Sequence, residues 1–389
     1  MHILLVITDY GSFNNFLSEL AIKLVNNGDR VDVICSPDKI INLQDKHAYT
    51  SLGIRFHYVN LPRSLNPIKV IKASRQISQL ITKLNPSVIN VHFTTGIFTT
   101  LLWRKPKQKI IGTLHGVGYI MAESRVKKMI FSIVEKFCFK RLDNIYVLNQ
   151  FDYNIVKQLH PTKTFVYQSS GVGFDDCKFN PSAVAEEEKK FLKERLGIRD
   201  GDFVLAYTGR FVDFKGFNIL IRAVSRLIQN GLYPNLKLML IGGKDPARET
   251  GLLPHEEAYY QSNPQFIKVD FTADVEKYLS LADLFVFPSA REGMPVCIME
   301  ALAMGLPVVT SDTRGCNDLV ENDFNGILLS EKPTVEETSS AIERLFCNRF
   351  LLRKLSENAL SRRDEYSRQQ FVLEQIEAYQ PQEFSNISA

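Results

Sequence analysis

Short apolar runs alternate with longer segments of helical period along most of the chain. In the first half these runs are rich in Val, Ile and aromatic residues, and they predict strands at residues 2–8, 30–36, 54–60, 87–92, 109–115, 144–149 and 164–169. The segments between most of them are amphipathic: from Phe16 to Leu24 apolar residues recur at helical spacing, and Gly28 ends the pattern. Strands that alternate with helices in this way predict βαβ units and a parallel sheet.

The alternation of predicted strands and helices is interrupted once, between residues 170 and 202, by glycines, a proline and a charge run. It then restarts, with predicted strands at residues 203–209, 236–242, 265–271, 284–288, 306–310 and 326–330. We therefore expect two doubly wound α/β domains, at 1–175 and 176–365, followed by a helix and tail at 366–389. In such sheets ligands bind beyond the carboxyl ends of the strands, so a cleft between the two sheets is the expected site.

The composition is that of an ordinary globular protein, with 389 residues of which 45% are apolar and 23% charged. Six cysteines occur without a C-x-x-C pair or a Cys/His cluster, which predicts reduced thiols and no disulfide framework. The apolar run at the N-terminus is too short for a signal peptide, and no apolar stretch reaches the roughly 18 residues of a spanning helix. These features favour a cytoplasmic protein.

Charge is distributed unevenly along the chain. Residues 1–180 hold 23 Lys and Arg against 12 Asp and Glu, a net of +11, whereas residues 181–389 hold 24 against 31, a net of −7. The basic half favours an anionic partner, which could be a phosphorylated substrate, a membrane surface or a nucleic acid. Of these, the nucleic acid is the least favoured, because the sequence contains no recognised binding motif and no aromatic stacking platform.

Residues 287–309 combine a strand end, a glycine turn and an apolar helix. Phe287 closes a predicted strand, and Gly293 is expected to give the turn its backbone freedom. Pro295 suits the first position of a helix that Gly305 would end. Free N–H groups and the helix dipole converge at such a helix start, which favours the binding of a diphosphate.

Glu300 lies within the same helix, roughly 7.5 Å along its axis from Pro295, which is about the reach from a diphosphate to the ribose of its nucleotide. The neighbours of Glu300 are almost all apolar, so a carboxylate here is costly unless it finds partners. Two ribose hydroxyls would supply them, because an ionised carboxylate can accept from both. The alternatives are that Glu300 lies at an exposed edge or pairs with an internal arginine.

Four segments of the chain together resemble the retaining glycosyltransferases of family 4. EGMPVCIMEALAMGLPVV (292–309) is similar to their E-x7-E motif, and YTGRFVDFKGFNILIRAV (207–224) to their G-R-x4-K-G segment. SSGVGFDDCKFNP (169–181) resembles the linker between their domains, and GTLHGVGY (112–119) resembles the histidine segment of members that assemble capsule, O-antigen and protein-linked glycans. The resemblance covers nearly the whole chain and implies the GT-B fold, in which the active site lies in the cleft between two Rossmann-like domains.

The resemblance implies a set of donor-binding residues. Its members are Gly11, Arg210, Lys215, Gly293, Met294, Pro295 and Glu300. Arg210 and Lys215 would clamp the donor diphosphate and offset the charge that builds on the leaving group. Gly11 stands alone where many relatives carry a Gly-Gly pair, which makes it a weak candidate. Because the cations and the helix start would do the work of a metal ion, no metal or other cofactor is expected.

Two catalytic candidates follow from the same resemblance. Glu292 would accept hydrogen bonds from the transferred sugar; it acts as a nucleophile in a double displacement, or only positions the donor if departure and attack occur on one face of the sugar. His115 would point into the cleft and contact the sugar near the reacting carbon, with a core histidine bonded to the backbone as the alternative. His92, at the end of the preceding strand, is a weaker candidate for contact with the acceptor.

The implied activity is the transfer of a hexose or N-acetylhexosamine, with retention, from a nucleotide diphosphate, most simply UDP, to a glycan acceptor on a polyprenyl diphosphate. Domain 1–175 would take the acceptor, domain 176–365 the donor, and the terminal helix would cross back to the first domain. A nucleotide-sugar epimerase or a phosphorylase of the same fold and a non-catalytic subunit that binds nucleotide sugars are the alternatives.

The segment 124–142 carries a basic face. At 100° per residue, Arg125, Lys128, Lys136 and Lys140 share one arc, and Met129 and Phe139 lie within it. The residues expected on the opposite side, facing the core, are Val126, Ile130, Ile133, Val134 and Phe137. A basic face with exposed apolar side chains predicts peripheral association with the anionic inner face of a membrane, and a merely solvated surface is the alternative.

Overall fold

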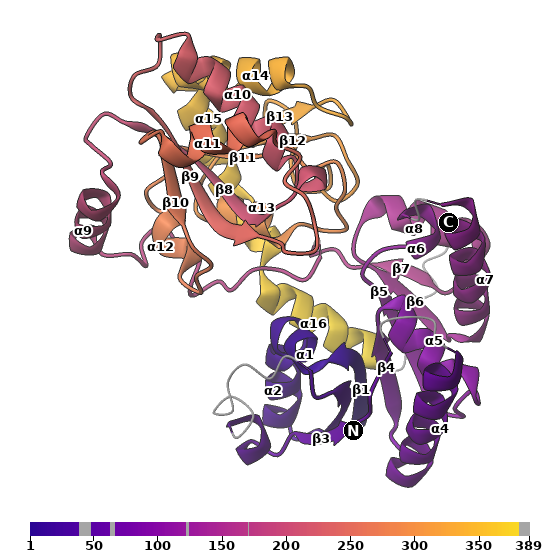
Figure 1. The fold of residues 1–389 in the computed structure, drawn as a ribbon. Coiled ribbons are helices and arrows are strands. Elements are labelled where there is room, and N and C mark those ends of the chain that lie inside the picture. Colours follow the sequence, from indigo (N-terminus) through magenta and orange to yellow (C-terminus); the bar gives the residue numbers. More distant parts are fainter. Residues whose placement is uncertain (39–47, 63–66, 122–123, 170, 381–389) are drawn as a thin grey trace, which may run out of the picture. The chain divides into compact units, whose positions relative to one another are not determined.

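The computed structural model describes residues 1–38, 48–62, 67–121, 124–169 and 171–380, and Figure 1 shows the fold. The chain forms two compact units, one of Met1–Gln168 with Phe371–Ala389 and the other of Ser169–Gln370. The first division follows Gln168, ahead of the position expected from the sequence. Each unit is a parallel sheet flanked by helices, the arrangement that alternating strands and helices predict.

The first unit contains a seven-stranded sheet in the order β3-β2-β1-β4-β5-β6-β7. The strands are β1 (His2–Asp9), β2 (Arg30–Ser36), β3 (Arg55–Tyr58), β4 (Val88–His92), β5 (Lys109–Leu114), β6 (Asn144–Val147) and β7 (Thr164–Val166). All pairs are parallel. The strand order reverses between β1 and β4, so the loops after these two strands are where a ligand of this sheet would bind.

Helices connect the strands of the first unit. They are α1 (Tyr10–Phe16), α2 (Ser18–Asn26), α4 (Pro67–Leu84), α5 (Thr94–Leu102), α6 (Gly118–Met121), α7 (Arg125–Arg141) and α8 (Gln150–Leu159). Three of them begin at residues whose side chains accept from the first turn, which are Asp9, Ser124 and Asn149. The caps fix the point at which each helix leaves its strand or loop.

The second unit contains a six-stranded parallel sheet in the order β10-β9-β8-β11-β12-β13. The strands are β8 (Phe203–Phe211), β9 (Leu236–Lys244), β10 (Phe266–Val269), β11 (Leu284–Phe287), β12 (Val308–Ser311) and β13 (Gly326–Leu329). Its order reverses between β8 and β11, which places the expected ligand site at the carboxyl ends of these strands. The predicted strands of both halves are all present.

The second unit also holds nine helical elements. They are α9 (Glu186–Leu196), η1 (Asp213–Lys215), α10 (Phe217–Gln229), α11 (Pro254–Ser262), α12 (Val275–Leu279), α13 (Val296–Ala303), α14 (Val335–Cys347), α15 (Arg349–Ser361) and η2 (Arg363–Tyr366). The short helix α13 is almost wholly apolar, and Ile298, Met299, Ala301 and Leu302 are completely buried. Its burial agrees with the helix predicted from residues 287–309.

The last helix, α16 (Arg368–Tyr379), begins in the second unit and packs on the first. The Tyr379 hydroxyl accepts from the Asn90 amide at 2.6 Å, and the Lys109 ammonium donates to the Ala378 carbonyl at 3.1 Å. At the other end of the same stretch, the Phe371 ring meets the Tyr167 ring at 4.8 Å. Helix α16 is therefore fastened along the first sheet.

Helix α7 exposes much of the apolar side that the sequence pattern assigned to the core. Val134 is buried as expected, but three other members of that side are solvent-exposed, namely Val126 (64%), Ile130 (41%) and Ile133 (62%). Phe139, expected on the basic arc, is completely buried instead. Periodicity locates an apolar stripe but not what covers it, and α7 packs against α5 and α6 through a different arc.

The six cysteines are free thiols, as the sequence predicted. Cys35, Cys138 and Cys316 are buried, and burial raises the pKa of each thiol. Within the described ranges, no helix combines the length and the apolar character that crossing a membrane requires.

Candidate active site

Lys215, predicted to bind the donor, and Glu292, predicted as a catalytic candidate, form an ion pair at the carboxyl ends of β8 and β11. The Lys215 ammonium lies 2.6 and 2.7 Å from the two carboxylate oxygens of Glu292. Lys215 ends η1, and Gly216 after it has a φ of +72° and presses against the Pro288 carbonyl, which a Cβ would approach to 2.0 Å. Only glycine fits this approach, so the loop that carries the lysine is held against the strand that leads to Glu292.

Glu292 is buried. Its side chain is 7% exposed, and the Ser289 hydroxyl donates to Oε1 at 2.6 Å. Burial raises the pKa of the Cys297 thiol well above its usual value, and the nearby Glu292 carboxylate adds to the shift. The carboxylate therefore receives three donor contacts from two side chains, which hold it in one orientation as a hydrogen-bond acceptor.

Three basic side chains surround the ring of Phe214 in the loop after β8. Arg210 Cζ lies 5.8 Å from the ring centroid, Lys215 Nζ 6.0 Å and Arg248 Cζ 5.6 Å. We call Arg210, Lys215 and Arg248 the cation cluster. Arg210 is 57% exposed and donates to Asp245 at 2.6 Å. Asp245 and Glu292 offset the charges of Arg210 and Lys215, but the two exposed guanidinium groups still present donors that suit a polyanion.

Helix α13 begins one position later than the sequence predicted. Pro295 is the residue before the helix, with extended backbone, and Val296 is the first helical residue. No side chain caps this end, so the first N–H groups are available to a ligand. The backbone of Gly293 is not in the left-handed region. Gly315 does adopt that conformation, and because it has no Cβ it can lie against the Gly293 carbonyl. The expected role of Gly293 in the turn is therefore wrong.

Glu300 is half-buried on α13 and makes no side-chain hydrogen bond within the described part of the chain. Burial raises the pKa of Glu300 to about 7, although the positive charges of Arg368 and Lys178 act in the opposite direction. Both cations belong to the same unit as Glu300, and they act on it through their charge. No donor among the described residues satisfies this carboxyl, and hydroxyl groups would be suitable partners.

In the first unit, the two predicted histidines contact one another. His92 ends β4, His115 follows β5 directly, and His92 Nδ1 lies 3.0 Å from His115 Nε2. The Phe93 ring stacks on His115 with centroids 4.0 Å apart, and the Phe16 ring lies 5.2 Å away. Burial lowers the pKa of His115 to about 3. The imidazole is therefore neutral near pH 7 and acts through hydrogen bonds rather than charge.

A buried carboxylate holds the loop that follows His115. Glu135 on α7 accepts from the backbone N–H of Gly118 at 2.6 Å and of Tyr119 at 3.1 Å, and from the Thr94 hydroxyl at 3.1 Å. Burial raises the pKa of Glu135. The side chain ties the loops after β4 and β5 to α7, so it supports the histidine segment without being part of it.

Gly11 lies in the first turn of α1, immediately after β1. The turn is capped by Asp9, whose carboxylate accepts from the Ser12 N–H at 2.9 Å. Gly11 thus lies at the start of a helix, just beyond the carboxyl end of β1.

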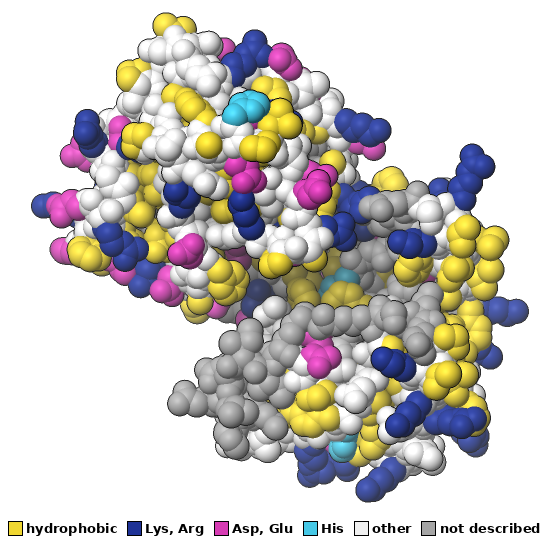
Figure 2. All heavy atoms as spheres, in the orientation of Figure 1, with side chains coloured by type: hydrophobic (Ala, Val, Ile, Leu, Met, Phe, Trp, Pro, Cys, Tyr) yellow, Lys and Arg dark blue, Asp and Glu magenta, His cyan; other side chains and the backbone are white. Residues whose placement is uncertain are grey.

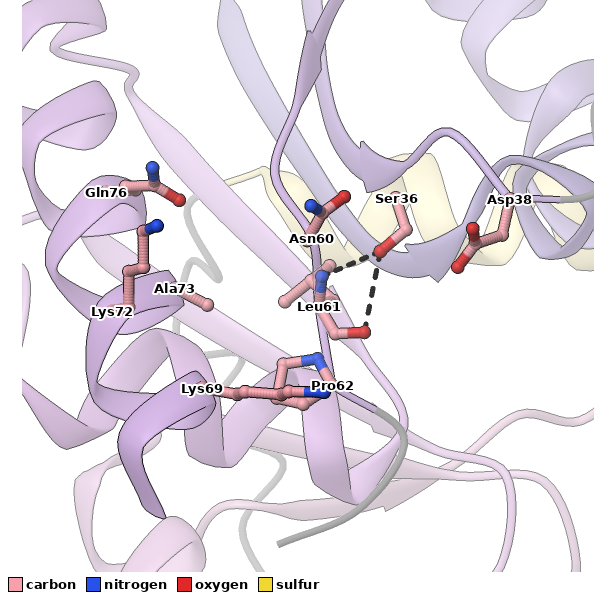
Figure 3. Close-up of a pocket in the computed structure, with 9 residues that line it drawn as sticks. All are labelled: Ser36, Asp38, Asn60, Leu61, Pro62, Lys69, Lys72, Ala73 and Gln76. Carbon is pink, nitrogen blue, oxygen red and sulfur yellow. Dashed lines mark hydrogen bonds between the residues drawn. The ribbon is translucent and has the colours of Figure 1, made fainter. Parts of the chain in front are cut away.

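A cavity of about 510 Å³ opens in the first unit at the carboxyl ends of β2 and β3 (Figure 3). Its lining residues are Ser36, Asp38, Asn60, Leu61, Pro62, Lys69, Lys72, Ala73 and Gln76. The buried Ser36 hydroxyl fixes one wall by donating to the Val59 carbonyl at 3.1 Å and accepting from the Leu61 N–H at 2.7 Å. Lys69 and Lys72 reach it from the first two turns of α4, and no predicted site residue lines it.

Sequence reasoning missed several residues of the second-unit site. Asp245 and Arg248 follow β9, and Ser289 follows β11. Their positions just after strand ends were the only feature of the sequence that could have indicated them. Their partners were not predictable, because the contacts join loops far apart in the chain. No set of three or more His, Cys, Asp or Glu side chains among the described residues is arranged to hold a metal ion.

Two family models match the chain, and both describe glycosyltransferases. The model described as Glycosyl transferases group 1 matches residues 188–362, and the model described as Glycosyl transferase 4-like matches residues 2–149. Together the two models cover most of both units. The first one includes the cation cluster, Glu292 and Glu300.

Characterised relatives and a solved structure agree with these matches. The chain is 29% identical over 293 residues (72% of each chain) to the Escherichia coli UDP-Gal:alpha-D-GlcNAc-diphosphoundecaprenol alpha-1,3-galactosyltransferase. It is 24% identical over 358 residues (90% of each) to the Campylobacter jejuni N,N'-diacetylbacillosaminyl-diphospho-undecaprenol alpha-1,3-N-acetylgalactosaminyltransferase. Its fold is similar to that of sucrose-phosphate synthase from Thermosynechococcus elongatus, with a TM-score of 0.76, 18% identity and coverage of 97% and 98%.

Proposed function

Since this chain is a glycosyltransferase of family 4 with the GT-B fold, we propose that it transfers a hexose or N-acetylhexosamine, with retention, from a UDP-sugar to a sugar on a polyprenyl diphosphate. The observation that carries the proposal is the Lys215–Glu292 pair beside the uncapped start of α13. The two relatives above, both named for diphosphoundecaprenol-linked acceptors, supply the substrate class.

The donor diphosphate would bind between the cation cluster and the first turn of α13. Each phosphate oxygen needs donors or positive charge, and this end of the sheet offers the guanidinium groups of Arg210 and Arg248, the Lys215 ammonium and backbone N–H groups. As the bond to the sugar breaks, negative charge grows on the departing diphosphate. Fixed cations stabilise that charge without reorganisation, which lowers the barrier to transfer.

Glu292 would position the donor sugar rather than attack it. Both of its oxygens contact the Lys215 ammonium, and Oε1 also accepts from Ser289. A carboxylate neutralised in this way is a weak nucleophile, but it remains a good acceptor for sugar hydroxyls. We therefore favour a reaction in which the leaving group departs and the acceptor attacks on the same face of the sugar, and nuclear magnetic resonance of the new anomeric centre would test retention.

The same charges support a reaction without a bound metal ion. A divalent cation in other transferases neutralises the diphosphate, and here three basic side chains surround one ring at the strand ends. Transfer that continues in excess EDTA would support this proposal, and transfer that stops until Mg²⁺ or Mn²⁺ is restored would contradict it.

The acceptor would bind to the first unit. The cavity in Figure 3 carries two lysines, Lys69 and Lys72, that suit the diphosphate of a lipid-linked sugar. On the same helix, Ile68 is 80% exposed and Ile71 is 39% exposed, which provides apolar surface beside the lysines. An anionic head joined to an apolar chain matches both properties.

Helix α7 would hold the enzyme at the membrane in which such an acceptor lies. Its exposed stripe of Val126, Met129, Ile130 and Ile133 recurs at helical spacing. Exposed lysines and arginines of α7 border the stripe, and Figure 2 shows apolar side chains edged by basic ones where α7 lies. The apolar side chains would enter the lipid, and the lysines and arginines would contact anionic headgroups. Together these contacts would bind the enzyme peripherally at the cytoplasmic face.

The test is a screen of UDP-sugars for UDP release that depends on a synthetic prenyl-diphosphate sugar. Release that requires the acceptor and is lost in Lys215→Ala supports transfer. UDP-sugar interconversion without acceptor would instead indicate an epimerase, and UDP binding without turnover would indicate a binding subunit. Salt-dependent binding of oligonucleotides in place of UDP would contradict the proposal.

A further inference from the structure

The hydrogen bond between His92 and His115 joins two neutral rings. Burial is the main cause that lowers the pKa of both imidazoles, and for His92 the neighbouring His115 lowers it further. A neutral imidazole carries one proton, on either Nδ1 or Nε2. The 3.0 Å contact joins Nδ1 of His92 to Nε2 of His115, so one of these two nitrogens carries the proton and the other accepts. The tautomers of the two rings are therefore coupled.

The surroundings of His92 favour one of the two arrangements. His92 is completely buried, and its Nε2 has no hydrogen-bond partner in the part of the chain that the structure describes. A proton on that nitrogen would be a buried N–H group without an acceptor, which proteins rarely contain. His92 therefore favours its proton on Nδ1, from which it donates to His115 Nε2. His115 must then carry its own proton on Nδ1.

The ring of His115 cannot easily turn to escape this arrangement. The Phe93 ring stacks on it at 4.0 Å with an interplanar angle of 22°. Phe93 has a φ of +64°, a conformation that residues other than glycine rarely adopt and that is concentrated at functional sites. The strained residue thus places its ring over the imidazole, and Nδ1 of His115 is not among the enclosed, unpartnered atoms of the described residues.

We propose that His92 is a positioning residue that fixes His115 in the Nδ1–H tautomer, so that the nitrogen left open to a ligand is a hydrogen-bond donor. The acceptor of that bond, a hydroxyl oxygen of the transferred sugar, rests on the proposed function; the tautomer does not. Without His92, an isolated imidazole would distribute its proton between both nitrogens, and only the Nδ1–H fraction would be competent to donate.

The tautomer is measured directly by long-range ¹H–¹⁵N spectra of the full chain labelled with ¹⁵N-histidine, since protonated and bare ring nitrogens have distinct shifts. We expect Nδ1–H for His115 between pH 6 and 8. In His92→Phe the Nε2–H form should become the major one. In His92→Asn, whose amide nitrogen can occupy the place of Nδ1 and donate, the Nδ1–H form should return. An Nε2–H tautomer in the unmodified protein overturns the proposal even if no variant folds.

Kinetics separate this proposal from the proposed function. If the competent fraction falls to about a tenth, kcat for transfer should fall about tenfold in His92→Phe. KM for the donor should change less than twofold, and His92→Asn should recover most of the rate. An altered tautomer with an unchanged kcat would contradict the positioning role. Absence of transfer by the unmodified enzyme would contradict the proposed function and leave the tautomer measurement standing.

Discussion

The Lys215 ammonium is shared between both carboxylate oxygens of Glu292, at 2.6 and 2.7 Å, and only 7% of the Glu292 side chain is exposed. Removing the lysine alone would leave a buried carboxylate without its counter-charge, which costs about 3 kcal/mol or more. The Lys215→Ala variant should therefore unfold at a lower denaturant concentration than the double variant that combines Lys215→Ala with Glu292→Gln. Equal stability of Lys215→Ala and the unmodified protein would show that the pair is not formed in solution.

Glu300 should make donor affinity depend on pH. Its pKa of about 7 means that the carboxyl is partly protonated near neutrality, whereas ribose hydroxyls donate best to the ionised form. Binding should therefore weaken as pH falls, by about tenfold between pH 8 and pH 6. A UDP-sugar is the suitable ligand for calorimetry, because its diphosphate does not titrate in this range.

Glu300→Gln should bind the same UDP-sugar more weakly at pH 8 and should lose this pH dependence. A pH profile that is the same in Glu300→Gln and the unmodified protein would assign the titration to another group. It would also remove the support for a ribose at this carboxylate.

The same raised pKa affects folding. A carboxyl that is harder to ionise in the folded state than in the unfolded chain lowers the free energy of unfolding at pH values where the unfolded chain is ionised. For Glu300 this loss of stability is absent at low pH and grows as pH rises from about 4.5 to about 7. The difference in unfolding free energy between Glu300→Gln and the unmodified protein should grow in favour of the variant over this range. A constant difference would contradict the raised pKa.

The cavity lysines should affect the acceptor and leave the donor unaffected. Lys69→Gln with Lys72→Gln removes two positive charges from the cavity lining, so KM for a prenyl-diphosphate acceptor should rise about tenfold. KM for the UDP-sugar should stay within twofold. Lys83→Gln, at the far end of the same helix, is the matched control. An unchanged acceptor KM would place the lipid diphosphate elsewhere.

The exposed stripe of α7 should determine membrane binding. Val126→Ser with Ile133→Ser changes side chains that are 64% and 62% exposed, so the fold should keep its stability. Sedimentation with vesicles of anionic lipid should nevertheless fall several-fold. Phe191→Ser, which changes a residue of α9 that is 61% exposed, is the control for the loss of an apolar surface group. Equal loss in the control would contradict a specific role of α7.

Glu135 should stabilise the histidine segment. Glu135→Leu leaves the N–H groups of Gly118 and Tyr119 without their acceptor, which costs about 1 to 3 kcal/mol. Glu135→Gln keeps one carbonyl oxygen in place and should cost less. Hydrogen exchange at residues 116–119 should accelerate in Glu135→Leu more than at the strands of the same sheet, and uniform acceleration would indicate general destabilisation instead.

The sequence alone determined the strands, the helices between them and the ends of the strands at which polar residues gather. Local patterns suffice for this, because strand and helix periods are properties of neighbouring residues. The choice of Arg210, Lys215 and Glu292 as site residues came instead from the resemblance to family 4. Parallel strands align their carboxyl ends at one edge of a sheet, which explains why such residues lie there.

Only the tertiary structure decided which side chains meet. The pairing of Lys215 with Glu292, the partnership of His92 with His115 and the support from Glu135 join residues that lie far apart in the sequence. The tertiary structure also decided which side of α7 is covered, and that side differs from the one that the apolar pattern of the helix predicted. An amphipathic pattern records how a helix divides into faces, whereas burial depends on the neighbours that packing brings to each face, and those neighbours come from elsewhere in the chain.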